Sequence, residues 1–249
     1  MSNLRNAFTQ RKALMAFITC GDPDLGTTIA IAKAAVAGGA NILELNIPFS
    51  DPTAADPVIQ QSNVRALKNG VTTDSVFMLV QQLRKELSTP IVVSTYANVV
   101  FSYGADRFAA KCKETGIDGI LIPDVPFEER QEFLPACQQA GVPLIYMLAV
   151  TSRERIRAIA SEANGFLYIM ACPGNKEQEL NALAATVKEC TDVPCLICLN
   201  GTDPARFSAV SQKVDGVTVD VPIVSIIEKQ GANAPVEVQN YIRQFAQQL

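Results

Sequence analysis

A single carboxylate within an apolar run is the feature of this sequence that suggests chemistry. Glu44 lies in the run Ile42–Ile47, directly before a loop rich in Pro, Asp and Ser that extends from Pro48 to Pro57. Burying an unpaired carboxylate costs several kcal/mol unless a raised pKa leaves the group neutral. Glu44 is therefore expected either to belong to an ion pair or to be held ready for proton transfer at the end of a buried strand.

The elements that must position Glu44 are indicated by apolar, β-rich runs that recur along the chain. Segments with helical spacing separate these runs, and each is long enough for a right-handed crossover. Eight alternations of strand and helix within 249 residues predict an α/β fold, a (β/α)8 TIM barrel that forms a single domain over residues 1–249. The predicted strands are Leu14–Thr19, Ile42–Ile47, Ile91–Tyr96, Gly119–Ile122, Leu144–Val150, Phe166–Met170, Cys195–Leu199 and Val217–Val221.

The segments that follow the predicted strands are richer in polar residues, Pro and Gly than the segments that precede them. Pro48–Pro57 and the run Pro123–Pro126 are examples. Enzymes with this fold carry their sites at the C-terminal ends of the strands. Glu44 is therefore expected at the functional end of the barrel.

Composition excludes several classes of function. The net charge is −4 and Lys and Arg form no cluster, so nothing favours binding to nucleic acid or to an acidic membrane surface. The start of the chain lacks the pattern of a signal peptide and no apolar run is long enough for a membrane span, which predicts a cytoplasmic protein. With no His and seven scattered Cys, neither a metal site nor a disulfide framework is expected, and Cys195 and Cys198 are interpreted as strand residues.

Several motifs in chain order resemble the alpha chain of tryptophan synthase, and the resemblance extends over nearly the whole sequence. The block Pro48-Phe49-Ser50-Asp51-Pro52 after Glu44 is highly specific to that family. The resemblance implies retro-aldol cleavage of indole-3-glycerol phosphate, with no cofactor in this chain, and a beta chain as partner that uses pyridoxal phosphate. The further matching motifs are Phe17–Asp24, Pro57–Gln60, Thr95–Asn98 and Ile122–Pro126.

The resemblance assigns two carboxylates to the reaction. Glu44 matches the group that moves a proton between the substrate hydroxyl and the ring carbon. The second family carboxylate, which holds the indole N–H, falls on Ala55, and a methyl group cannot accept a hydrogen bond. Asp56, one position further along the chain, is the candidate to replace the missing carboxylate. This role would require the loop to adopt a different conformation from that of the family.

The family's indole pocket and its partner contacts are retained. Phe17 and Leu121 are interpreted equally well as ordinary barrel core. The residues that match the aromatic pocket are Phe17, Tyr96, Leu121, Pro123 and Tyr168, and those that match the beta-chain contact are Pro48, Asp51, Asn98 and Pro126.

The family's phosphate site differs in three places. Glycine-rich turns after the sixth, seventh and eighth strands become Ala171–Glu177, a turn that contains Asn200, and Asp220 followed by Val221. An aspartate repels a phosphate dianion, and Pro222 removes an N–H donor. Asn200 and Asp220 are therefore predicted to contact a substrate without phosphate.

Three interpretations follow from these differences. The favoured one is an altered carbon–carbon lyase that acts on a small aromatic substrate, uncharged or cationic. The second is a catalytically silent or re-engineered homologue that binds an aromatic ligand or regulates a beta chain. The third is an ordinary alpha chain whose loops align with those of the family in a different way, so that the apparent differences at the site are not real.

Overall fold

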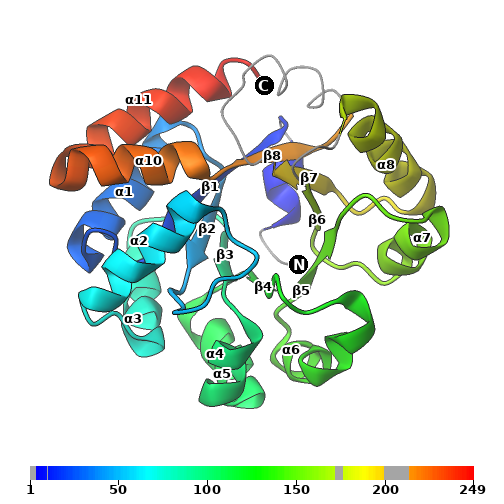
Figure 1. The fold of residues 1–249 in the computed structure, drawn as a ribbon, viewed down its shortest axis with the longest axis horizontal. Helices are drawn as coiled ribbons and strands as arrows, with labels where there is room; N and C mark the ends of the chain where they lie inside the picture. The colour runs from blue at the N-terminus through cyan, green and yellow to red at the C-terminus, as the bar shows by residue number, and fades with distance from the viewer. Residues whose placement is uncertain (1–3, 10, 172–175, 199–212) are drawn as a thin grey trace.

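Eight parallel strands form a closed barrel in the order β1 to β8, with β8 paired to β1 (Figure 1). The computed structural model describes residues 4–9, 11–171, 176–198 and 213–249. This architecture confirms the predicted (β/α)8 fold. The strands are β1 (Ala13–Thr19), β2 (Ile42–Asn46), β3 (Ile91–Ser94), β4 (Gly119–Leu121), β5 (Leu144–Leu148), β6 (Leu167–Met170), β7 (Cys195–Cys198) and β8 (Gly216–Val219).

Helices surround the barrel and cover the outer face of its strands (Figure 1). The α-helices are α1 (Leu25–Gly38), α2 (Pro57–Lys68), α3 (Thr73–Arg84), α4 (Ala97–Tyr103), α5 (Ala105–Thr115), α6 (Leu134–Ala140), α7 (Arg153–Ser161), α8 (Glu177–Cys190), α10 (Val221–Gln230) and α11 (Ala234–Ala246). Short 3-10 helices are η1 (Arg5–Phe8), η2 (Phe127–Glu132) and η3 (Gly231–Asn233). None of the described helices is long and apolar enough to cross a membrane.

Side chains alternate along each strand between the barrel interior and the layer under the helices. In β2, Leu43 and Leu45 belong to the outer layer, whereas Ile42 belongs to the inner core. Glu44 is two residues beyond Ile42, so the period of two directs its side chain into the barrel. The strand geometry therefore brings the carboxylate of Glu44 to the axis of the barrel.

The same alternation separates Cys195 from Cys198. Cys195 packs in the outer layer and Cys198 in the inner core, because three positions along a strand reverse the direction of the side chain. Both side chains are buried, and neither forms a disulfide. This pair therefore has the wrong geometry for a shared metal ion, and the described residues contain no cluster of three or more metal-ligating side chains.

The N-terminal segment contributes to the inner core. Leu4 is fully buried there, and the Phe8 ring lies 5.9 Å from the Phe166 ring, measured between centroids. Leu4 also lies against Gly119 and Gly165, which come just before or at the start of β4 and β6. The beginning of the chain therefore closes the end of the barrel opposite to Glu44, a role that its sequence pattern did not indicate.

The outer layer depends on a cluster of aromatic rings beneath α3 and α5. Phe77 is almost fully buried and packs 5.5 Å from Phe108 and 5.6 Å from Tyr103, again between ring centroids. We expect Phe77→Ala to lower the free energy of unfolding by about 3–5 kcal/mol, because the truncated side chain leaves a cavity. Urea denaturation followed by circular dichroism measures this loss, and the exposed Met78→Ala is the control. A loss below about 1 kcal/mol would show that the layer collapses around the cavity.

Candidate functional site

Glu44 is the buried carboxylate at the centre of the site. Its side chain is only 3 % exposed, and no hydrogen-bond partner is found for its Oε2 atom among the described residues. The sequence prediction left open an ion pair or proton transfer, and no salt bridge involving Glu44 exists in the described part of the chain. The geometry agrees with proton transfer.

Burial raises the pKa of Glu44 from its ordinary 4.5 to about 8. The hydroxyl groups of Ser94 and Tyr168 oppose this rise, because a hydrogen bond to the ionised carboxylate favours it, and the nearby Asp220 carboxylate adds to the rise. A carboxyl group with a pKa near 8 carries its proton at neutral pH. It can therefore act first as a general acid and, once ionised, as a general base.

A narrow cavity of about 70 Å³ lies over Glu44, at the C-terminal ends of the strands. Most residues predicted from the sequence for the aromatic pocket and the reaction line it together. They are Phe17, Glu44, Asp56, Tyr96, Leu121, Pro123, Tyr168 and Asp220. Asn200 lies outside the described residues, so its predicted contact with the substrate stays a prediction.

Other residues that line this cavity were not predicted from the sequence. Asn46 is two positions beyond Glu44 on β2, and Ser94 is two positions beyond the inner-core Val92 on β3, so alternation along each strand could have identified both. Met147 and Met170 come from the ends of β5 and β6. Their apolar side chains carry no chemical signal in the sequence, which explains why they were missed.

Asp56 begins α2. Its carboxylate accepts a hydrogen bond from the main-chain N–H of Val58 at 2.9 Å, and Pro57 occupies the first position of the helix. The side chain of Gln60 donates to the Ala55 carbonyl oxygen at 2.9 Å, which ties the loop to the same helix. Asp56 reaches the cavity wall but already serves as the cap of the helix, and its catalytic role stays a prediction.

Asp220 lies at the start of α10, on the side of the cavity formed by β7 and β8. It is 5 % exposed, and the thiol of Cys198 donates to its Oδ2 atom at 3.1 Å. Burial raises the pKa of Asp220, whereas the Cys198 thiol and the main chain at Val221 lower it. A carboxylate therefore occupies the N-terminus of α10, where a glycine-rich turn would leave N–H groups open to an anion.

The comparisons with known proteins identify the family of the chain. The sequence model described as "Tryptophan synthase alpha chain" matches residues 3–249. The chain belongs to the tryptophan synthase alpha chain family. A relative of that name from Lacticaseibacillus casei is 38 % identical, with coverage of 98 % of this chain and 94 % of the relative. One from Shouchella clausii is 39 % identical, with coverage of 90 % and 86 %.

Solved structures of the family share the architecture. The tryptophan synthase alpha chain from Legionella pneumophila superposes with a TM-score of 0.89 at 31 % identity, and the match covers 99 % of this chain and 98 % of that one. A chain of the tryptophan synthase complex from Pyrococcus furiosus gives a TM-score of 0.85 at 30 % identity, with coverage of 96 % and 99 %. The chain therefore belongs to a family of lyases.

The residues predicted to match the family's beta-chain contact follow the ends of β2, β3 and β4, three of them on loops and Asn98 in the first turn of α4. Asp51 and Asn98 are exposed and line a shallow groove with Phe49, whose ring stacks on Tyr96 at 5.3 Å between centroids. Pro48 is buried at the start of its loop, and Pro126 is exposed. The stacked rings of Phe49 and Tyr96 connect this groove to the cavity, because Tyr96 lines the latter.

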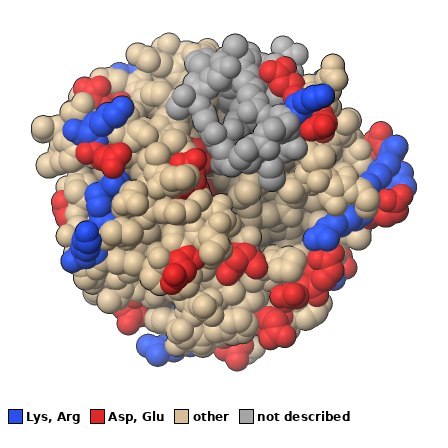
Figure 2. All heavy atoms as spheres, in the orientation of Figure 1, with Lys and Arg blue, Asp and Glu red and all other residues tan. Residues whose placement is uncertain are grey.

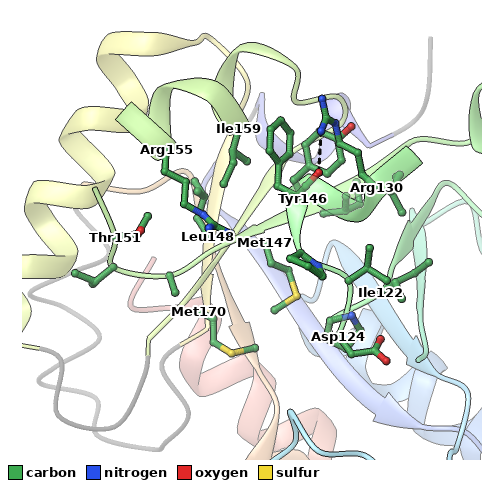
Figure 3. Close-up of a pocket in the computed structure, with 18 residues that line it drawn as sticks. Ile122, Asp124, Arg130, Tyr146, Met147, Leu148, Thr151, Arg155, Ile159 and Met170 are labelled. Atoms are coloured by element: carbon green, nitrogen blue, oxygen red, sulfur yellow. Dashed lines mark hydrogen bonds between the residues drawn. The ribbon is translucent and has the colours of Figure 1, made fainter. Parts of the chain in front are cut away.

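A second, larger cavity of about 440 Å³ adjoins the first (Figure 3). Pro123, Met147 and Met170 line both cavities. Figure 3 shows the two methionine side chains on one side of this space and the Arg155 side chain on another. Because methionine side chains are flexible, Met147 and Met170 form the adjustable wall between the two cavities.

The hydroxyl of Tyr168 provides a test of the position of Glu44. In the unaltered protein the Tyr168 hydroxyl favours the ionised carboxylate of Glu44. We therefore expect Tyr168→Phe, which removes this hydroxyl, to raise the pKa of Glu44 further. The pH dependence of the catalysed reaction measures this as an upward shift of its alkaline limb. Tyr146→Phe is the control, since the Tyr146 hydroxyl bonds to Arg130 instead. An unchanged or lowered limb in Tyr168→Phe would contradict the assignment.

Proposed function

We propose that this chain is an aldolase-type carbon–carbon lyase that acts on a small aromatic substrate without a phosphate group. Glu44 serves as its acid and base. The single observation that carries the proposal is that one cavity brings together two carboxyl groups: the buried Glu44, whose Oε2 atom has no hydrogen-bond partner among the described residues, and Asp220 at the N-terminus of α10. The first group supplies proton transfer, and the second opposes a phosphate dianion.

Proton transfer follows from the protonation state of Glu44. In cleavage, neutral Glu44 donates its proton to the ring carbon that bears the side chain. The resulting carboxylate takes the proton of the adjacent side-chain hydroxyl, the carbon–carbon bond breaks, and an aldehyde and the free aromatic ring leave. Glu44 ends protonated, as it began, and general acid–base catalysis of this kind contributes about 10²–10⁴-fold to rates.

The charges near the barrel mouth support a substrate without phosphate. None of the described residues that line the cavity is Lys or Arg. On the face shown in Figure 2, the Lys and Arg side chains lie towards the periphery of the described surface. A dianion placed beside the Asp220 carboxyl group would therefore meet no compensating cation among the described residues that line the cavity.

The cavity accepts a ring when its methionine wall moves. Its volume of about 70 Å³ is smaller than the roughly 150 Å³ of an engineered cavity that binds benzene. Rotation of Met147 and Met170 towards the adjoining 440 Å³ space would make room between Phe17, Tyr96 and Tyr168. The pocket residues predicted from the sequence thus supply the aromatic contacts.

The reverse reaction tests the proposal. The protein is incubated with indole and either D-glyceraldehyde or its 3-phosphate, and the loss of indole is followed. We expect condensation with the uncharged aldehyde at a rate at least equal to that with the phosphate. A clear preference for the phosphate would contradict the loss of phosphate recognition.

A second function is favoured by one observation, the methyl group of Ala55 in the cavity wall. A chain without the second family carboxylate could bind an aromatic ligand and regulate a beta chain without catalysis. In that case neither aldehyde is consumed, indole still binds, and the rate of an added beta chain changes. The exposed positions of Asp51, Asn98 and Pro126 are available for such a contact.

A further inference from the structure

The acidic character of the cavity goes beyond the loss of a phosphate site. Three carboxyl groups, those of Glu44, Asp56 and Asp220, line a space of about 70 Å³, and no described lining residue carries a positive charge. Apolar and aromatic side chains form most of the rest of its wall. Such a cavity complements a ligand that combines a flat ring with a cation.

Two of these carboxyl groups differ in how they are held. The Oε2 atom of Glu44 is buried in the cavity floor without a hydrogen-bond partner in the described part of the protein. Asp220 is fixed by the Cys198 thiol and by the main chain at Val221. Burial raises the pKa of Asp220, and these donors oppose that rise while they orient its carboxyl group towards the cavity.

We propose that Asp220 binds the ammonium group of an arylalkylamine, whose ring lies between Phe17, Tyr96 and Tyr168. The proposal deepens the function above by naming the substrate class, and it rests on that function. An ammonium group supplies the charge that the cavity lacks and donates hydrogen bonds to a carboxylate that is already oriented. Asp220 is thus the residue that selects the substrate, whereas Glu44 performs the proton transfer.

Direct binding of two matched ligands tests this inference. Tryptamine and tryptophol share the indole ring and the two-carbon chain and differ in an ammonium or a hydroxyl group. The protein contains no tryptophan, so the fluorescence of the indole ring reports on the ligand alone. We expect tryptamine to bind at least about tenfold more tightly than tryptophol, the gain typical of a hydrogen bond to a charged partner.

Two variants assign the preference to Asp220. Asp220→Asn should bring the ratio of the two dissociation constants close to one and leave tryptophol binding nearly unchanged. Asp192→Asn, an exposed carboxylate just before β7 at the opposite end of the barrel, should keep the ratio of the unaltered protein. The ratio is measured within each variant, so a change in overall stability does not alter its meaning.

The outcomes separate this inference from the proposed function. Equal binding of both ligands to the unaltered protein, or a preference that survives in Asp220→Asn, overturns the inference and leaves the lyase proposal intact. Asp220 would then be only the residue that precedes α10. Failure of both ligands and of free indole to bind contradicts the aromatic site itself, and with it both proposals.

Discussion

Glu44→Gln should reduce the lyase reaction by at least about 100-fold, because an amide can neither donate nor accept the proton that the reaction moves. The two side chains have the same shape, so the cavity and the packing around Tyr168 and Ser94 should be unchanged. Single-turnover rates of indole consumption with glyceraldehyde measure the loss. Full retention of activity would remove Glu44 from the mechanism.

The same substitution should stabilise the protein at alkaline pH. The unfolded chain ionises Glu44 near its ordinary pKa of 4.5, whereas the folded protein keeps the proton until about pH 8. Ionisation of Glu44 in the unfolded chain therefore lowers the free energy of unfolding by about 1.4 kcal/mol for each pH unit between these two values. Above pH 8 this loss of stability no longer grows. Gln carries no proton to lose, so Glu44→Gln should be more stable than the unaltered protein by several kcal/mol at pH 8–9 and nearly equal to it near pH 4.

Urea denaturation at pH 4.5, 6.5 and 8.5 tests this second effect. Glu237→Gln, an exposed position on α11, is the matched control and should show no such dependence on pH. A stability difference that does not grow with pH would show that Glu44 is already ionised in the folded protein. Loss of activity together with gain of stability is the result expected of a group kept in an unfavourable environment for catalysis.

The pH profile of the unaltered protein follows from the same protonation state. Cleavage requires neutral Glu44, so its rate should fall as the pH rises through about 8. Tyr168→Phe should shift this alkaline limb to higher pH. The two measurements therefore test one assignment from two directions.

The fold was predictable because the hydrophobic pattern of a parallel barrel is repeated along the whole chain. Each predicted strand matches an observed one, although several end earlier than predicted. The run Ile91–Tyr96 is an example: β3 ends at Ser94, because Tyr96 already precedes the first residue of α4. Apolar runs continue past the end of a strand, so composition alone does not mark the point where pairing stops.

The site was predictable where chemistry was visible in one residue and less so where it depends on neighbours. Glu44 was identified from its place in a strand, and the structure adds the cause of its raised pKa. The roles of Asp56 and Cys198 were not visible, because the first depends on the capping of α2 and the second on the approach of β7 to Asp220. Such contacts are set by tertiary structure, which a local pattern does not contain.

Ala55 provides the other large expected effect. Its side chain lies in the cavity wall beside Phe17 and Ile59, and its main-chain position is fixed by hydrogen bonds to Pro52 and Gln60. Ala55→Asp places a carboxylate at the position that matches the second family group. We expect it to increase the rate of indole condensation by about 100-fold, because the carboxylate accepts a hydrogen bond from the indole N–H as positive charge develops.

Ala55→Asn is the control of equal size, and its uncharged amide should give a much smaller gain. The paired comparison also decides between the interpretations of this chain. If the unaltered protein is inactive and only Ala55→Asp has measurable activity, then the protein lacks the second carboxylate and retains the rest of the site. If the unaltered protein is already fast and Ala55→Asp adds nothing, another group performs the role. Asp56→Asn should then abolish the activity, while the Asn side chain can still accept the hydrogen bond from Val58 N–H that caps α2.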